Sequence, residues 1–203
     1  LHPVPMDYAG ADTQGAIGYM FQKALRNEFH RRGIQREVVS VVTQVRVDGG
    51  DPAFAQPRKP IGSFMDEDTA QQRVLQLGWK VREDSGRGWR RVVPSPLPVE
   101  VIELGAIRTL IQAGFVVVAC GGGGIPVIEN ENGKLRGVEA VIDKDFTSGL
   151  LARQLPAALF LITTSVEKVA LYYGAADQRW LDRATLTEVR DYYAAGHFPV
   201  GSM

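Results

Sequence analysis

Apolar residues recur along the chain at two spacings, which predict helices and strands in alternation. Between Asp12 and Gly33 they recur every three or four positions, the spacing of an amphipathic helix that the glycine ends. The next segment, 37–47 (EVVSVVTQVRV), is almost continuously apolar and rich in β-branched residues. Such a segment is typical of a strand covered on both faces, so we expect a mainly parallel sheet.

Further helices and strands continue the alternation. The predicted elements are helix 101–113, strand 115–119, helix 145–155, strand 158–165, and a last helix that begins at Thr185 or Thr187 and ends at Gly196. Helices that alternate with strands in this way predict an α/β domain with helices on both faces of its sheet.

Residues 46–98 interrupt the alternation. Proline, glycine and charged residues dominate this segment, and one short helical pattern lies near 66–77. Because long excursions of this kind are uncommon in a compact domain, we expect a lid or a protruding subdomain.

Composition excludes several classes of partner. The chain has 203 residues, of which 45% are hydrophobic, enough for one substantial core. Lys plus Arg equals Asp plus Glu at 23 each, so no overall basic field exists to hold nucleic acid. The longest apolar runs fall short of the roughly 20 residues of a membrane helix. A single cysteine, Cys120, and the lack of a signal-peptide pattern favour a cytoplasmic location.

Four consecutive glycines, Gly121 to Gly124, follow the predicted strand 115–119. At the carboxyl end of a parallel strand, bare backbone can approach an anion and direct N–H groups at it. Pro126 and its apolar neighbours do not open a helix, so the dinucleotide-binding fingerprint is not met, and no Walker lysine follows. The quartet is either a ligand loop, which we favour, or a tight connection.

A second cluster, Asp143, Lys144 and Asp145, stands just before the predicted helix 145–155. Asp145 is either the N-cap of that helix or a residue facing the same pocket as the helix N-terminus. Phosphoryl transfer needs lysines that neutralise charge and a carboxylate that holds lysine or magnesium. The alternative is a solvated turn.

Two weaker clusters complete the candidates. The first is Thr163, Thr164 and Ser165 at the end of the predicted strand 158–165, with Lys168 shortly after; these residues could contact a nucleotide or form a turn. The second is a set of cationic residues in the 46–98 excursion, which could clamp an anion or be solvated surface: Lys59, Arg87, Arg90 and Arg91. The three histidines have no metal-ligand spacing, so no metal site is predicted.

Several motifs occur in an order that resembles the carbamate kinases of the amino-acid kinase family. They are DTQGAIGY, RKPIG, EDSGRGWRRVVPSPLP, ACGGGGIPVI, GVEAVIDKDF, YYGAADQRWLD and GHFPVGSM, and together they extend over essentially the whole chain. The resemblance implies one amino-acid kinase domain over 1–203, folded as a three-layer α/β/α sandwich with a mainly parallel central sheet. It also implies that 46–98 is an inserted, protruding subdomain.

The same resemblance implies an activity and its partners. Carbamate kinases transfer phosphate reversibly between ATP and carbamate, giving ADP and carbamoyl phosphate, with Mg²⁺ accompanying the nucleotide. The reaction commonly runs toward ATP at the end of the arginine deiminase pathway. These enzymes usually form homodimers through an apolar helical surface, which GAIGYMFQKAL could supply here.

By resemblance, roles fall on named residues. Lys144 would neutralise charge, Asp145 would organise the site, and Lys59 would reach over the substrate from the lid. The implied substrate and phosphate contacts are Gly121, Gly122, Gly123, Gly124, Arg90 and Arg91; the implied nucleotide contacts are Thr164, Ser165, Lys168 and Tyr173.

Some family features are not found in the sequence. The family's GGNAL-like and GNGPQVG-like loops and its GPK segment are missing, so we expect an internal portion of a longer chain that is nearly inactive alone. Ser165 and Glu167 stand where the family usually has aspartates. Two alternatives therefore stay open: a non-catalytic relative that binds nucleotide, and an amino-acid kinase acting on another acyl substrate.

Overall fold

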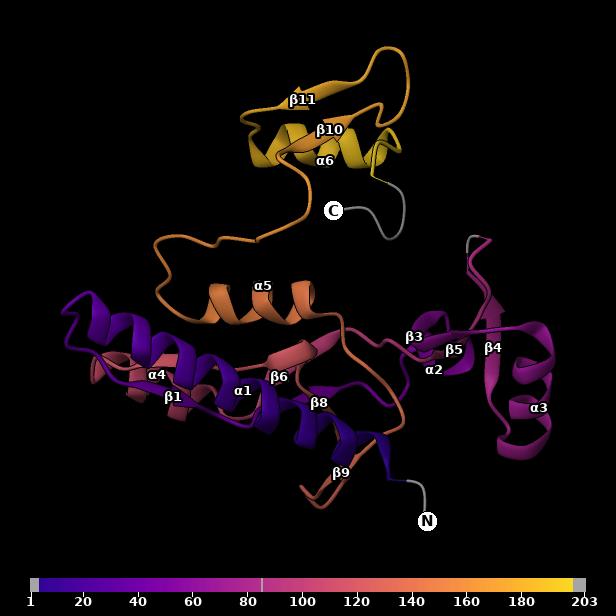
Figure 1. Cartoon of the computed structure of the whole chain (residues 1–203), viewed down its shortest axis with the longest axis horizontal. Coiled ribbons are helices and arrows are strands. Elements are labelled where there is room, and N and C mark those ends of the chain that lie inside the picture. Colours follow the sequence, from indigo (N-terminus) through magenta and orange to yellow (C-terminus); the bar gives the residue numbers. More distant parts are fainter. Residues whose placement is uncertain (1–3, 85, 199–203) are drawn as a thin grey trace. The chain divides into compact units, whose positions relative to one another are not determined.

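A computed structural model describes residues 4–84 and 86–198 of the chain (Figure 1). It divides into two compact units, Leu1–Ala158 and Leu159–Met203, and each unit is described by itself. The single domain over 1–203 stays a prediction.

The first unit contains most of the regular structure. Its helices are α1 (Met6–Arg31), α2 (Pro52–Ala55), α3 (Glu67–Leu77), α4 (Leu104–Gln112) and α5 (Lys144–Gln154). Its strands are β1 (Val38–Ser40), β2 (Gln44–Val47), β3 (Lys59–Met65), β4 (Lys80–Glu83), β5 (Trp89–Val93), β6 (Pro98–Val101), β7 (Val116–Val118), β8 (Ile125–Glu129) and β9 (Leu135–Gly137). The second unit contains β10 (Val169–Leu171), β11 (Arg179–Leu181) and α6 (Leu186–Ala194).

The described strands form four separate sheets instead of one central sheet. Their orders are β1-β7, β6-β2-β8-β9, β3-β5-β4 and β10-β11. Only the β1–β7 and β2–β8 pairings among those described are parallel, so the expected mainly parallel sheet is not found in this part of the chain. The fold is mixed α/β.

The predicted strand 37–47 is two strands that belong to different sheets. β1 pairs with β7, and β2 pairs with β6 and β8. The chain breaks between them at 41–43, where the Val41 N–H bonds Val118 O but the Thr43 N–H bonds a side chain of α1. Apolar residues continue on both sides of the break, so the spacing of apolar residues does not reveal it.

The predicted strand 158–165 is wrong, because these residues adopt no regular structure. No described strand pairs with the segment, and the Leu159 and Leu161 side chains are 78% and 73% exposed. An apolar, β-branched run becomes a strand only when a neighbouring strand accepts and donates its backbone hydrogen bonds. Thr164 and Ser165 therefore do not stand at a strand end.

The helix predictions are largely confirmed, with shifted ends. α3 begins after its N-cap Asp66 and stops at Gly78, which has a left-handed backbone. α6 has Thr185 as its cap, completed by a capping box with Glu188, and Gly196 has φ +82° just beyond its end. The two larger shifts are at α1, which begins six residues earlier than predicted, and at α4, which begins later because β6 occupies 98–101.

The 46–98 excursion contains its own antiparallel sheet, β3-β5-β4, with α3 between β3 and β4 in the sequence. Aromatic rings and guanidinium groups stack on this sheet: Arg91 lies 4.9 Å from the Trp79 ring centroid, and Arg87 lies 4.9 Å from that of Phe64. Its role as a lid stays a prediction.

The core of the first unit adjoins the glycine quartet. α1 packs against β1, β7 and β8, and α5 packs against β6 and the glycine turn. Figure 1 shows α1 beside β1 and β8, and α5 beside β6. The buried cluster consists of Val45, Val47, Val101, Ile107, Cys120, Ile142 and Leu150. In the described parts of the chain, no helix has both the length and the apolar character needed to cross a membrane.

Candidate functional site

The glycine quartet follows a strand as predicted. β7 ends at Val118, and Gly121–Gly123 form a single 3₁₀ turn. Cys120, which precedes the turn, has φ +56°, a left-handed conformation that costs a non-glycine residue about 1–2 kcal/mol. The surrounding structure therefore has to hold this corner in place.

Packing explains only part of the glycine requirement. A Cβ at Gly123 would overlap the Ile142 carbonyl oxygen, and a Cβ at Gly124 would overlap the Val45 side chain. At Gly121, by contrast, a Cβ would make only an ordinary 3.5 Å contact with Gln14. Gly121 and Gly122 are exposed, so bare backbone faces outward at this end of the turn, as a ligand loop requires.

Asp143 joins the glycine turn to the predicted lid lysine. It caps α5 by accepting a 3.0 Å hydrogen bond from the Asp145 N–H, so Asp145 is not the N-cap. Its other carboxylate oxygen accepts a 2.6 Å hydrogen bond from Lys59 Nζ. Because Ile142 and Asp143 pack directly against Gly123, the ion pair lies beside the glycine turn.

The surroundings of Asp143 favour its ionised form. Partial burial alone would raise the pKa of this carboxyl, but three features outweigh it: the Lys59 ammonium, the Asp145 N–H and the nearby charge of Lys144. The pKa of Asp143 is therefore lowered from its ordinary value. A carboxylate that stays ionised can hold Lys59 as a fixed cation next to the turn.

Lys144 and Asp145 occupy the first turn of α5. Their side chains are 71% and 52% exposed and lie 3.6 Å apart, so they form a weak surface pair. Within the described part of the chain, neither side chain forms a hydrogen bond with the glycine turn, although Asp145 contributes its backbone N–H to Asp143. The charge-neutralising role of Lys144 stays a prediction.

The two predicted arginines lie next to each other on β5, but each is held by its own acidic partner. Arg90 lies 3.3 Å from Asp84, and Arg91 lies 3.4 Å from Glu139. These contacts link the arginines to neighbouring strands and loops and do not gather them with the Lys59–Asp143 pair.

The predicted nucleotide contacts all belong to the second unit, so their meeting with the glycine turn stays a prediction. Thr164, Ser165 and Tyr173 are exposed. Lys168 Nζ lies 2.6 Å from Asp182 Oδ1, and hydrogen bonding to this carboxylate raises the pKa of Lys168. Lys168 thus remains a cation but already has an anionic partner.

Cys120 is suited to packing and not to nucleophilic chemistry. Its side chain is buried, and burial raises the pKa of the thiol to about 11. A neutral, buried thiol is a poor nucleophile at physiological pH.

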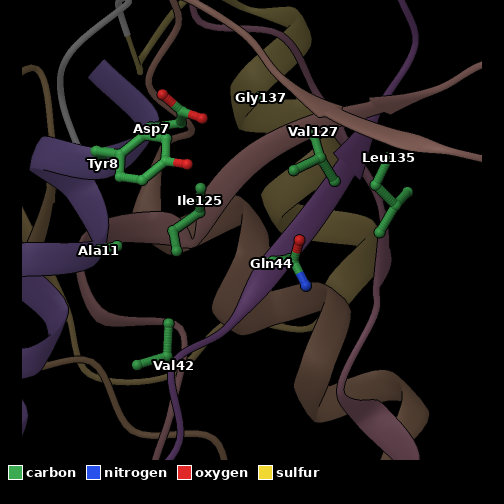
Figure 2. Close-up of a pocket in the computed structure, with 9 residues that line it drawn as sticks. All are labelled: Asp7, Tyr8, Ala11, Val42, Gln44, Ile125, Val127, Leu135 and Gly137. Atoms are coloured by element: carbon green, nitrogen blue, oxygen red, sulfur yellow. The ribbon is translucent and has the colours of Figure 1, made fainter. Parts of the chain in front are cut away.

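A shallow pocket of about 340 Å³ lies elsewhere in the first unit, between the start of α1 and strands β2, β8 and β9 (Figure 2). None of the predicted site residues lines it. Its lining residues are Asp7, Tyr8, Ala11, Val42, Gln44, Ile125, Val127, Leu135 and Gly137.

Sequence reasoning missed several features of the candidate site. It named Asp143 in the second cluster but did not pair it with Lys59, and the resemblance assigned the organising role to Asp145. Buried polar side chains behind the glycine turn were missed entirely: Gln14, Thr43 and Thr147. A polar residue inside an otherwise apolar run, such as Thr43 in EVVSVVTQVRV, was the available signal.

Known proteins are similar to this chain over most or all of its length. The sequence profile of the Amino acid kinase family matches residues 23–203. A carbamate kinase of Pyrococcus horikoshii is 54% identical over all of this chain, and a carbamate kinase-like protein of Escherichia coli is 50% identical over 98% of it. The solved structure of a carbamate kinase from Giardia lamblia, bound to AMP-PNP, superimposes with a TM-score of 0.88 at 42% identity over the whole chain.

The chain spans about 65% of the length of these relatives. The family profile nevertheless covers nearly all of it, from residue 23 onward. The chain therefore belongs to the amino acid kinase family.

Proposed function

We propose that the full-length gene product is a carbamate kinase, transferring phosphate reversibly between ATP and carbamate. The observation that carries the proposal is the Lys59–Asp143 pair beside the outward-facing glycine turn. It supplies a fixed cation, a carboxylate that holds it, and bare backbone, which is what phosphoryl transfer asks of a protein. Similarity to carbamate kinases over the whole chain supports the choice of substrate.

In the direction of ATP formation, a terminal phosphate oxygen of ADP attacks the phosphorus of carbamoyl phosphate. The new P–O bond forms as the bond to the carbamate oxygen breaks, and that electron pair leaves with carbamate. Negative charge on the transferring group grows more diffuse, so fixed positive charges and N–H donors lower the barrier. Lys59 and Lys144 are the cations for this role, and Gly121 and Gly122 offer the backbone.

Magnesium enters as part of the nucleotide substrate. No group of three His, Cys, Asp or Glu side chains in the described residues could hold a metal, and Asp143 is already engaged by Lys59. Mg²⁺ is commonly held through substrate phosphates and only one or two carboxylates. In the proposed complex, Thr164, Ser165, Lys168 and Tyr173 contact the nucleotide and Asp145 organises the site. Arg90 and Arg91, each beside its own carboxylate in the structure, are the proposed phosphate contacts.

We also propose that the complete protein has a three-layer α/β/α sandwich, with the 46–98 excursion as its lid, and that it pairs as a homodimer through α1. One face of α1 leaves large apolar side chains exposed at three- and four-residue spacing: Ile17 (41%), Met20 (48%) and Phe21 (47%). An amphipathic helix with such a face is suited to an isologous interface. The cytoplasmic location and the role in arginine breakdown stay predictions.

A second candidate is a non-catalytic relative that binds nucleotide without transferring phosphate. The engagement of Lys168 by Asp182 favours it, because this lysine would have to leave a carboxylate to reach a phosphate. An amino-acid kinase with another acyl substrate is the third reading.

Calorimetry and a donor panel separate these candidates. Full-length protein would be titrated with MgADP, and ATP formation would then be followed with carbamoyl phosphate or acetyl phosphate as the donor. A carbamate kinase forms ATP much faster from carbamoyl phosphate. Binding of ADP without turnover from either donor would favour the non-catalytic relative, and preference for acetyl phosphate would favour the broader kinase.

A further inference from the structure

Two buried threonine hydroxyls bond the glycine turn, one at each end. Thr43 and Thr147 are both fully buried, and they are the only threonines among the buried polar residues of the described chain. We propose that Thr43 and Thr147 are positioning residues, which fix the backbone of the turn for phosphoryl transfer. The expected effect on catalysis rests on the proposed function, whereas the anchoring of the turn does not.

Thr43 holds the entry to the turn. Its hydroxyl donates to the Val41 carbonyl oxygen at 2.8 Å, which commits its single hydrogen. A lone pair of the same oxygen then accepts the Cys120 N–H at 3.0 Å. Cys120 is the residue with the left-handed backbone, so this hydrogen bond acts at the corner where the chain leaves the strand direction.

Thr147 holds the exit. It lies on the inner face of α5, and its hydroxyl donates to the Gly123 carbonyl oxygen at 2.8 Å in a buried contact. This bond attaches the turn to the helix whose N-terminus carries Asp143 and Lys144. The relative placement of the turn and the lysines therefore depends on it.

Gln14 supports Thr43 from α1. Its side-chain amide pairs with both backbone groups of Thr43, accepting from the N–H at 2.8 Å and donating to the carbonyl oxygen at 3.1 Å. Gln14 is 7% exposed. Both backbone groups of Thr43 are therefore bonded at the break between β1 and β2, and the Thr43 hydroxyl is held in a fixed direction.

Such anchors matter because glycine has little conformational preference of its own. A four-glycine turn without side-chain anchors would sample many backbone states, and its outward N–H groups would not be aligned when the phosphoryl group arrives. Hydrogen bonds at both ends remove that freedom while leaving Gly121 and Gly122 open.

The test replaces each hydroxyl in the full-length protein by a methyl group, in Thr43→Val and Thr147→Val, and restores it in Thr43→Ser and Thr147→Ser. Thr109→Val is the control, because the Thr109 hydroxyl also bonds a backbone carbonyl, that of Gly105 at 2.9 Å, on the exposed face of α4. Hydrogen exchange of the peptide covering 119–125 reports on the turn without requiring activity. Steady-state ATP formation reports on catalysis.

We expect the valine variants to raise amide exchange in 119–125 by about tenfold, the effect of losing one buried hydrogen bond. The value of kcat should fall on the order of tenfold to a hundredfold, with KM for ADP nearly unchanged, because the misplaced group is the turn. The serine variants should recover both quantities, and Thr109→Val should change neither.

Unchanged exchange and unchanged kcat in the valine variants would overturn the proposal, as would an equal effect of Thr109→Val. If the parent protein forms no ATP but exchange in 119–125 still rises selectively, the proposed function fails and the anchoring of the turn stands. If a valine variant does not fold, its serine counterpart decides: full activity and slow exchange there support the hydroxyl as the required group.

Discussion

Lys59 Nζ lies 2.6 Å from Asp143 Oδ2, which joins the first strand of the 46–98 excursion to the cap of α5. The two residues are 84 positions apart in sequence. Since Asp143 also packs beside Gly123, this one ion pair connects the predicted lid, the helix N-terminus and the glycine turn.

Replacing Lys59 by methionine in the full-length protein should reduce kcat for ATP formation by about a hundredfold or more, because a preorganised cation is lost from the transferring group. Lys134→Met, in the exposed connection between β8 and β9, is the control and should leave kcat unchanged. Equal rates for the two variants would remove Lys59 from the proposed site.

The Lys59–Asp143 pair should also stabilise the fold in a pH-dependent way. The folded-state pKa of Asp143 is lowered, so the stabilisation is present above its unfolded pKa of about 3.9 and is lost as pH falls through the folded pKa. Both side chains are partly exposed, so we expect about 0.5–1 kcal/mol. Urea unfolding of parent and Asp143→Asn should differ by this amount from pH 8 to 5, and the difference should shrink as pH falls below about 4.

A difference between parent and Asp143→Asn that persists unchanged at pH 3 would contradict this assignment. It would mean that the difference does not come from the charge of Asp143 and its ion pair, since the asparagine oxygen can still cap α5. Lys59→Met is a second test by the same unfolding measurement, because it removes the ion pair and keeps the Asp143 carboxylate as the cap of α5.

The glycines should separate into structural and functional positions. Gly123→Ala should lower the free energy of unfolding by about 2 kcal/mol or more, because its Cβ would overlap the Ile142 carbonyl oxygen and φ is +109°. Gly121→Ala should be nearly neutral for stability and still reduce kcat, since it adds a methyl group at the open end of the turn. Thermal melting of both variants checks the expected effects on stability, and ATP formation checks the expected effects on kcat.

Cys120 should resist thiol reagents. Burial raises the pKa of its thiol to about 11, so the native 203-residue chain at pH 8 should react with Ellman's reagent far more slowly than the same chain unfolded. Rapid reaction of the native thiol would show that the corner before the glycine turn opens readily.

Local patterns predicted the helices well, because caps and apolar spacing are properties of short segments: Asp66, Thr185 and Gly196 all stand at helix ends. The strands were harder. The run 37–47 looks uniform in sequence but changes sheet at Thr43, and the run 158–165 has no paired neighbour in the described chain. Strand pairing depends on distant residues, which no local pattern records.

The candidate site divides in the same way. The glycine turn and the Asp143–Asp145 cluster were visible in the sequence because their residue types are unusual for their positions. The Lys59–Asp143 contact and the bonds from Thr43 and Thr147 join segments that are far apart, so only the folded chain brings them together.

The most direct measurement is ATP formation by the full-length protein from MgADP and carbamoyl phosphate, with Lys59→Ala, Lys144→Ala and the control Lys134→Ala beside it. The account predicts ATP formation in parent and control, and a fall of about a hundredfold in each of the other two variants. No ATP from a folded, ADP-binding parent protein, or equal rates in all four proteins, would contradict it.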